Sequence, residues 1–210
     1  QELVDNLRIL SLAGHETTAS TLAWTVVHLA EQPALWEELV AEAQSVGSVP
    51  LSPADLKKYP VAESIFRESL RMHPPVALHG RMVIEPIQMG EQIVQPGIHL
   101  LCPVWLLYRD PERYPEPDRF HPHRWTGKEG IGVVDTLAFG TGPHFCLGYH
   151  LAWLEAVQFL TTLALLYAPT HTQPHIKKRG RETYLPLSHP PHGLRVAWEP
   201  GSSALVPGKR

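Results

Sequence analysis

The side chain with the most distinctive chemical setting in this sequence is the thiol of Cys146. It lies in a glycine-rich segment that reads Phe139-Gly140-Thr141-Gly142-Pro143-His144-Phe145-Cys146-Leu147-Gly148. A long apolar stretch follows directly and predicts a helix, whose dipole and unpaired N–H groups favour a thiolate over a thiol. Gly140, Gly142 and Gly148 leave room near the sulfur for a large flat ligand. The segment predicts a nucleophile or a metal ligand, against the alternative of an inert buried cysteine.

A second segment with possible chemistry is residues 13–18, Ala-Gly-His-Glu-Thr-Thr, near the centre of an apolar stretch that predicts one helix over residues 2–31. Glycine inside a helix costs about 1 kcal/mol relative to alanine, and a threonine hydroxyl that bonds back to a carbonyl can bend the helix. In a buried helix this combination predicts a local distortion that makes room for a ligand. The alternative is a polar stripe on an amphipathic helix, because Gly14, Thr17 and Thr18 share a face.

Charged residues that could pair lie on a predicted helix over about residues 60–72. Glu68 and Arg71 are three residues apart and therefore share a helix face. A rival pair on the same helix is Glu63 with Arg67. The helix is expected to end at the double proline that follows His73.

Four segments, in this order along the chain, resemble motifs of the cytochrome P450 family. They are residues 13–18, 68–71, 120–125 (Phe-His-Pro-His-Arg-Trp) and 139–148. The resemblance implies a mainly α fold with small β-sheets, namely the C-terminal portion of the cytochrome P450 fold from its long central distal helix to the C-terminus. We assign residues 1–199 to this haem-binding part, and expect residues 200–210 to be a disordered tail.

The resemblance also implies a cofactor, haem b (iron protoporphyrin IX), with the Cys146 thiolate as its axial metal ligand. His144 and Arg81 would then lie near the haem propionates; for Arg81 the alternative is an exposed strand arginine. The other residues expected around the cofactor are Phe139, Gly140, Gly148 and Ala13.

Catalytic and structural roles follow from the same resemblance. Thr17 would hydrogen-bond dioxygen, and Glu16 would help relay protons from solvent. Glu68, Arg71 and Arg124 would form a buried structural triad, with Arg119 as the fallback for Arg124. The positions expected to contact substrate are Ile9, Ala13, Gly14, Val76, Ala77 and Leu78.

The implied function is a haem-thiolate monooxygenase, an oxidoreductase that activates O2 and inserts one oxygen atom into a small hydrophobic organic substrate. Electrons would come from a ferredoxin or a flavoprotein reductase. Three alternatives stay open: a peroxide-driven or isomerising haem-thiolate enzyme, a non-catalytic haem-binding sensor or electron carrier, and a partner-binding fragment without cofactor. Thr17 and Glu16 argue against a carrier, which needs no proton relay.

Composition narrows the possible partners, the cellular compartment and the kinds of metal site. The chain has 210 residues, 43% of them hydrophobic, and a formal net charge of -3, so it predicts an ordinary core and no nucleic-acid partner. Two cysteines argue against a disulfide framework and favour a reducing compartment. We expect a cytoplasmic protein of bacterial origin. Its 13 histidines lack the close pair spacing of a zinc site.

The first residue falls inside the predicted helix over residues 2–31 or directly before it, with no start methionine and no entry loop, so we expect a segment of a longer protein. The N-terminal half would then be a partner of this chain, and any membrane anchor would lie there. Other predicted elements are a helix over 34–46, a helix start at Ser52, strands over 76–83 and 91–95, an all-round apolar helix over about 148–167, and a hairpin of 184–187 with 193–198.

Overall fold

The computed structural model describes residues 1–50, 52–126, 137–169, 187–191 and 195–200. The α-helices are α1 (Glu2–Glu31), α2 (Pro33–Val46), α3 (Pro60–Met72), α4 (Val104–Leu107) and α5 (Tyr149–Leu166). The short 3-10 helices are η1 (Pro53–Lys58), η2 (Pro122–Trp125) and η4 (Gly142–His144). The strands are β1 (Leu78–Met82), β2 (Ile87–Met89), β3 (Gln92–Val94), β4 (His99–Pro103), β5 (Tyr167–Pro169) and β6 (Trp198–Pro200). The predicted mixture of many helices and small sheets is confirmed.

Local sequence explains where the helices begin and end. Pro33 and Pro60 occupy first-turn positions of α2 and α3, where a missing N–H costs nothing. Gly47 ends α2 in the left-handed conformation, with φ of 67°. The first turn of α3 is capped by a side chain of another helix: the Glu42 carboxylate of α2 accepts the N–H groups of Val61 and Ala62 at 2.6 and 2.9 Å. Burial raises the pKa of Glu42, and these two hydrogen bonds oppose the rise.

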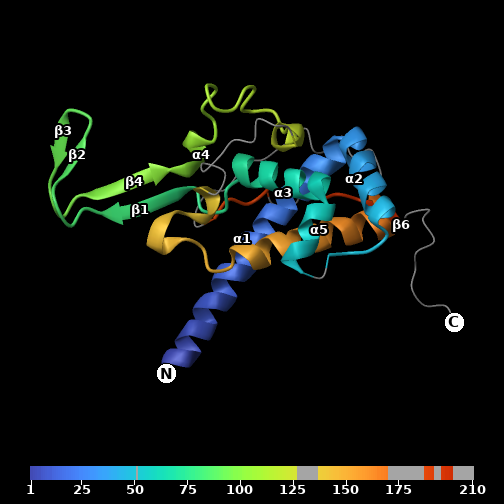
Figure 1. Cartoon of the computed structure of the whole chain (residues 1–210), viewed down its shortest axis with the longest axis horizontal. Coiled ribbons are helices and arrows are strands. Elements are labelled where there is room, and N and C mark those ends of the chain that lie inside the picture. The colour runs from blue at the N-terminus through green and yellow to red at the C-terminus, as the bar shows by residue number, and fades with distance from the viewer. Residues whose placement is uncertain (51, 127–136, 170–186, 192–194, 201–210) are drawn as a thin grey trace.

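The core lies where α2, α3 and α5 pack on the C-terminal half of α1 (Figure 1). Its fully buried members include Leu29, Leu39, Ile65, Phe66 and Leu160, one or two from each helix. Burying side chains of this size stabilises a fold by roughly 1.5–3 kcal/mol each. This core fixes α1 and α5, the two helices next to the candidate site.

The two sheets formed by β1 to β4 extend to one side of the helices as an arm (Figure 1). β1 pairs antiparallel with β4, which places Arg81 opposite Leu100, while β2 pairs with β3. The two predicted strands are therefore present, but they do not share a sheet, and β4 was not predicted. At the end of α5, β5 pairs with β6. Of the predicted terminal hairpin, residues 184–186 and 193–194 lie outside the described residues, as do residues 201–210 of the predicted tail.

Side-chain burial is uneven along α1 and around α5, and for α5 this corrects the prediction of a helix buried on nearly every side. Residues 20–29 of α1 hold its buried positions, whereas the apolar side chains of its first half are exposed, such as Leu3 and Leu12. That half projects away from the other helices, so no described segment covers it (Figure 1). In α5, Trp153 and Leu160 are buried but Leu151 and Phe159 are exposed, so this helix is not buried on every side. No helix among the described residues is long and apolar enough to cross a membrane.

Candidate functional site

The carboxylate of Glu68 is the centre of a buried polar cluster. Arg71 donates to it from Nε and Nη2 at 3.0 and 2.9 Å, and Arg124 donates from Nε at 3.1 Å. The Trp125 indole N–H and the His121 backbone N–H add two further donors at 2.8 and 2.9 Å. Both members of the Glu68–Arg71 pair are almost completely buried. The structure thus brings together the three side chains of the predicted triad.

Of the two candidate arginines, only Arg124 directs its side chain to Glu68 in the described structure. Arg119, the fallback, directs its side chain to the exposed Glu116 at 3.3 Å and offers only its backbone carbonyl to Arg71. Arg71 also donates to the carbonyls of Tyr108 and Pro117, both at 2.8 Å. The cluster therefore ties α3 to the irregular chain that follows α4.

The cysteine segment forms a tight loop in front of α5. The N–H of Cys146 donates to the carbonyl of Phe139 at 2.9 Å, which closes the loop and leaves the thiol exposed and free. Phe139 anchors the loop by edge contact with the ring of Tyr149, with the ring centroids 4.8 Å apart. A Cβ on Gly148 would lie 3.8 Å from the sulfur, so glycine keeps that side of Cys146 open.

Gly140 is a point of close approach in this loop. Its φ is 80°, and a Cβ there would lie 3.3 Å from the His144 carbonyl oxygen and 4.0 Å from Cε1 of His79. Gly142 also has a left-handed φ, 64°, but no atom outside its chain neighbours lies within 4 Å of the position a Cβ would take.

These contacts give a prediction for alanine at the two positions. Gly142→Ala should lower the free energy of unfolding by about 1–2 kcal/mol, the usual cost of a left-handed L-residue. Gly140→Ala should lower it further, because the new methyl group also presses on the His144 carbonyl. Urea unfolding of both variants measures the difference. Equal losses would contradict a close approach at Gly140.

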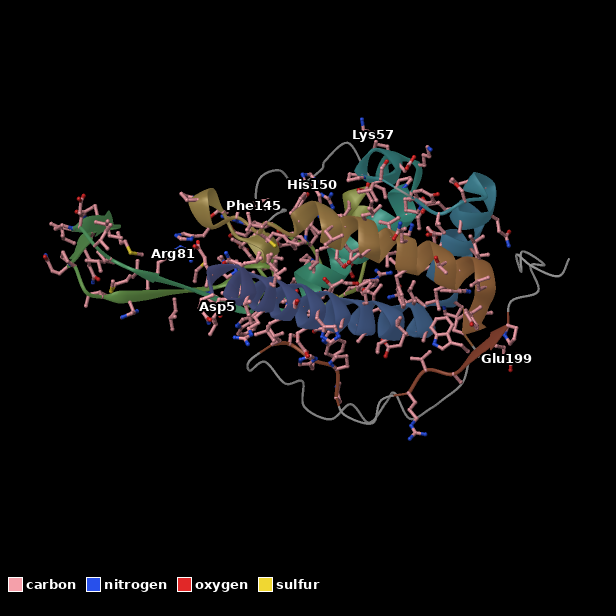
Figure 2. All side chains as sticks on the ribbon, turned by 90° about the horizontal axis from the view of Figure 1, so that it is seen from below. Asp5, Lys57, Arg81, Phe145, His150 and Glu199 are labelled. Carbon is pink, nitrogen blue, oxygen red and sulfur yellow. The ribbon has the colours of Figure 1, made fainter. Side chains whose placement is uncertain are left out.

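Two exposed basic side chains, Arg81 and His144, lie at this end of the molecule. Figure 2 shows Arg81 and Phe145 at the same end of the molecule, and Figure 1 shows the loop next to β1. Arg81 is exposed, and its Nη1 donates to the neighbouring Gly80 carbonyl at 2.8 Å. His144 is also exposed, at the end of η4. Among the described residues, no acidic side chain forms an ion pair with Arg81 or His144, so both remain available to an anionic ligand.

His79 is a member of this group that the sequence did not single out. It lies two residues before Arg81 on β1 and is half-buried against the loop at Gly140. Burial lowers the pKa of His79, and the nearby Arg81 charge lowers it further. The alternation of His79 and Arg81 along a predicted strand was the available signal, because residues at i and i+2 share a face.

On α1, the Thr17 hydroxyl donates to the Ala13 carbonyl at 2.7 Å, the back-bond that the sequence suggested. The helix nonetheless continues from Glu2 to Glu31 without interruption. The Glu16 carboxylate lies 3.5 Å from Nδ1 of His15, and both side chains are partly exposed. Ala13 and Gly14 are exposed on the same stretch. The N-terminal half of α1, which carries Asp5, lies at the same end of the molecule as Arg81 and Phe145 (Figures 1 and 2).

The predicted substrate contacts lie on two segments. Ile9, Ala13 and Gly14 are exposed on α1. On the chain that leads into β1, Val76 and Leu78 are exposed and Ala77 is buried. The exposed apolar side chains of both segments could line a hydrophobic site.

Comparison with known proteins gives consistent matches. The family model described as Cytochrome P450 matches residues 1–185. "Cytochrome P450 BJ-4 homolog" of Sinorhizobium fredii is 46% identical over 200 residues, covering 93% of this chain and 44% of the relative. "Cytochrome P450 BJ-4" of Bradyrhizobium diazoefficiens shows the same identity and coverage. The structure of retinoic acid bound cyanobacterial CYP120A1 aligns with a TM-score of 0.81 and 27% identity, covering 91% of this chain and 44% of that chain. The chain spans less than half the length of these relatives.

Proposed function

Because the chain belongs to the cytochrome P450 family, we propose that it supplies the haem-binding part of a haem-thiolate monooxygenase. The observation that carries this proposal is the exposed thiol of Cys146, held by a closed glycine loop at the start of α5. When bound, the haem supplies activation of dioxygen and transfer of one oxygen atom to an organic substrate, and electron donation from the thiolate favours O–O cleavage.

The residues around Cys146 fit this cofactor. Among the described residues, no group of three or more His, Cys, Asp or Glu side chains could hold a metal ion. A haem would supply the other ligands of an iron held by Cys146. Gly148 leaves the sulfur approachable, and Arg81 and His144 would hold the propionates by charge-assisted hydrogen bonds. The other residues we assign to the cofactor are Phe139, Gly140 and Ala13.

On α1 we assign proton delivery to Thr17 and Glu16. The Thr17 hydroxyl can rotate from the Ala13 carbonyl to donate to a ligand, and it then accepts a proton in turn. Glu16 reaches solvent and lies beside His15, so it can exchange protons with bulk water. General acid–base groups of this kind contribute about 10²- to 10⁴-fold to rates.

Thr17→Ala should leave cofactor binding intact but uncouple reductant consumption from product formation, lowering the product formed per reductant by about tenfold or more. The ratio is measured by following reductant oxidation, peroxide release and product together, with a substrate identified by its shift of the resting Soret band. Thr18→Ala is the matched control, since it also removes a threonine hydroxyl, but one position further along the helix. Full coupling in Thr17→Ala would contradict the relay role.

The substrate we propose is a small hydrophobic organic molecule. Ile9 and Gly14 on α1, and Val76 and Leu78 before and in β1, offer apolar surface without charge. Ala77 is buried and would hold the backbone in place between Val76 and Leu78. Binding sites for such ligands are mostly apolar with few polar groups, which this set resembles.

We assign electron supply to a ferredoxin or a flavoprotein reductase. The relatives contain a further region that this chain does not match. We also propose that the apolar side chains of the first half of α1 contact the counterpart of that region. Their exposure supports this, with Leu3 at 71% and Leu12 at 70%.

The test of the function uses the full protein loaded with haem. A monooxygenase should form product only with an electron donor and O2. Product formed with a hydroperoxide alone would instead support the peroxide-driven alternative, and absence of product with either would support a sensor or carrier.

A further inference from the structure

Two buried histidines, 45 residues apart in the sequence, face each other between α1 and α3. Nε2 of His28 lies 2.9 Å from Nε2 of His73, which is a hydrogen bond in which one nitrogen must donate and the other accept. The side chains are almost fully enclosed, with exposed fractions of 3% and 2%. His28 lies in the last two turns of α1, and His73 caps the C-terminus of α3.

Aromatic rings close the pair on both sides. Trp24 stacks on His73 with the centroids 3.7 Å apart, and Phe120 stacks on His28 at 4.1 Å. The four rings form a continuous stack that joins α1, the end of α3 and the chain before η2. Thr25 and Ser69 add a hydroxyl contact of 2.8 Å between the same two helices. The pair thus occupies the centre of the α1–α3 contact.

The number of protons that the pair can hold is limited by its geometry. Two imidazoles have four ring nitrogens, and the hydrogen bond survives with two or three of them protonated. With all four protonated, two N–H groups would point at each other at 2.9 Å, and two positive charges would meet at two almost fully buried side chains. The folded protein therefore excludes at least one proton that the unfolded chain would bind.

We propose that the His28–His73 pair is an acid-sensitive latch, which holds α1 against the end of α3 at neutral pH and opens when both rings become cationic. Opening would release the chain that follows His73. Pro75 in that chain accepts the N–H of Ser188 at 3.1 Å, and Ser20 of α1 donates to the Ser188 carbonyl. This second tie connects the same two regions, so the latch and Ser188 would loosen together. The inference rests on these contacts and not on the proposed reaction.

Charged and titratable groups near the two histidines modify how the latch responds to pH. On α1, the Glu31 carboxylate lies 3.8 Å from Nδ1 of His28 and can balance one positive charge, but not two. Beyond α3, Arg109 donates to the Met72 carbonyl at 3.1 Å, which adds positive charge next to His73. His121 follows Phe120 and donates its backbone N–H to Glu68, whose charge Arg71 and Arg124 already pair. The single charge of Glu31 therefore does not offset a doubly protonated pair.

The direction of the pH effect follows from proton counting. Below the usual histidine pKa of about 6.5 the unfolded chain binds more protons than the folded one, so stability falls as pH falls. Each excluded proton lowers the folding equilibrium constant by about tenfold per pH unit in that range. The double variant His28→Phe/His73→Phe keeps four stacked rings and removes both titrating groups.

Urea unfolding of the wild type and of the double variant, between about pH 5 and about pH 7.5, tests the latch across the usual histidine pKa. We divide the folding equilibrium constant of the wild type by that of the variant. Below the usual histidine pKa this ratio should fall by about tenfold per pH unit for one excluded proton and about a hundredfold for two. A ratio independent of pH would overturn the proposal. His123→Gln removes an exposed histidine beside Glu38 and is the control: it should lose as much stability at acid pH as the wild type does.

Hydrogen exchange on the wild type supplies a second test if the double variant fails to fold. After correction for intrinsic exchange rates, the amides of Trp24–Leu29 should lose protection at acid pH relative to those of Val157–Ala164 in α5. Equal loss in the two helices would overturn the proposal.

Discussion

Replacing Cys146 by serine is expected to abolish the red-shifted Soret band of the reduced protein with carbon monoxide. The band requires a thiolate on the iron, and the loop offers no second sulfur, because Cys102 lies on β4 opposite His79. A serine hydroxyl is a poorer electron donor than a thiolate and would not restore the push that favours O–O cleavage. We therefore expect complete loss of the band and of oxygenation.

The measurement is an absorption spectrum of the reduced protein, before and after carbon monoxide. Cys102→Ser is the matched control, since it removes the other free thiol of the described chain and should leave the band unchanged. An unchanged band in Cys146→Ser would refute the ligand assignment. Loss of the band in Cys102→Ser alone would move the assignment to β4.

Glu68→Gln is expected to lower the free energy of unfolding by about 3–5 kcal/mol, the usual cost of removing one partner from a buried ion pair. The side chain keeps its volume, but Arg71 and Arg124 lose the charge that both contact. Its new amide would also point N–H groups at donors, including the indole N–H of Trp125. A loss of this size is a large fraction of the stability of most domains, about 5–15 kcal/mol, so much of the variant should be unfolded.

Urea unfolding, or the soluble yield where the variant is too unstable, measures this loss. The control is Arg119→Gln, which removes an arginine from the same stretch of chain but only an exposed pair with Glu116. Its effect should lie within about 0–1 kcal/mol, as for surface salt bridges. Similar losses in the two variants would contradict the central role of Glu68.

The parts predicted best from the sequence were those with a local pattern. The closed loop at Cys146 and the helix behind it follow from glycine spacing and an apolar run, both contained in a few dozen residues. The contact of Glu68 with Arg71 needed only helical spacing. The contact with Arg124 needed the ordered family motifs as well, because no periodicity links residues 56 apart.

What escaped prediction depends on distant contacts. β4 and its pairing with β1 are set by a register across the β2–β3 hairpin, which the apolar run at Leu100 and Leu101 does not reveal. The His28–His73 contact joins two helices and carries no motif. The apolar residues of α1 suggested a buried helix around residues 13–18, although burial also requires a neighbouring segment, and the described residues provide one only for the second half of α1.

Tyr108 has a consequence for the order of folding. Its carbonyl accepts from Arg71, and its hydroxyl accepts the N–H of Ala138, at the entry to the cysteine loop. Burial raises the pKa of Tyr108, so the hydroxyl stays neutral. The two hydrogen bonds span 37 and 30 residues, and contacts that close such long stretches form late. The loop should therefore reach its final shape only after the chain between Tyr108 and Ala138 has closed, which would make cofactor capture a late event in folding.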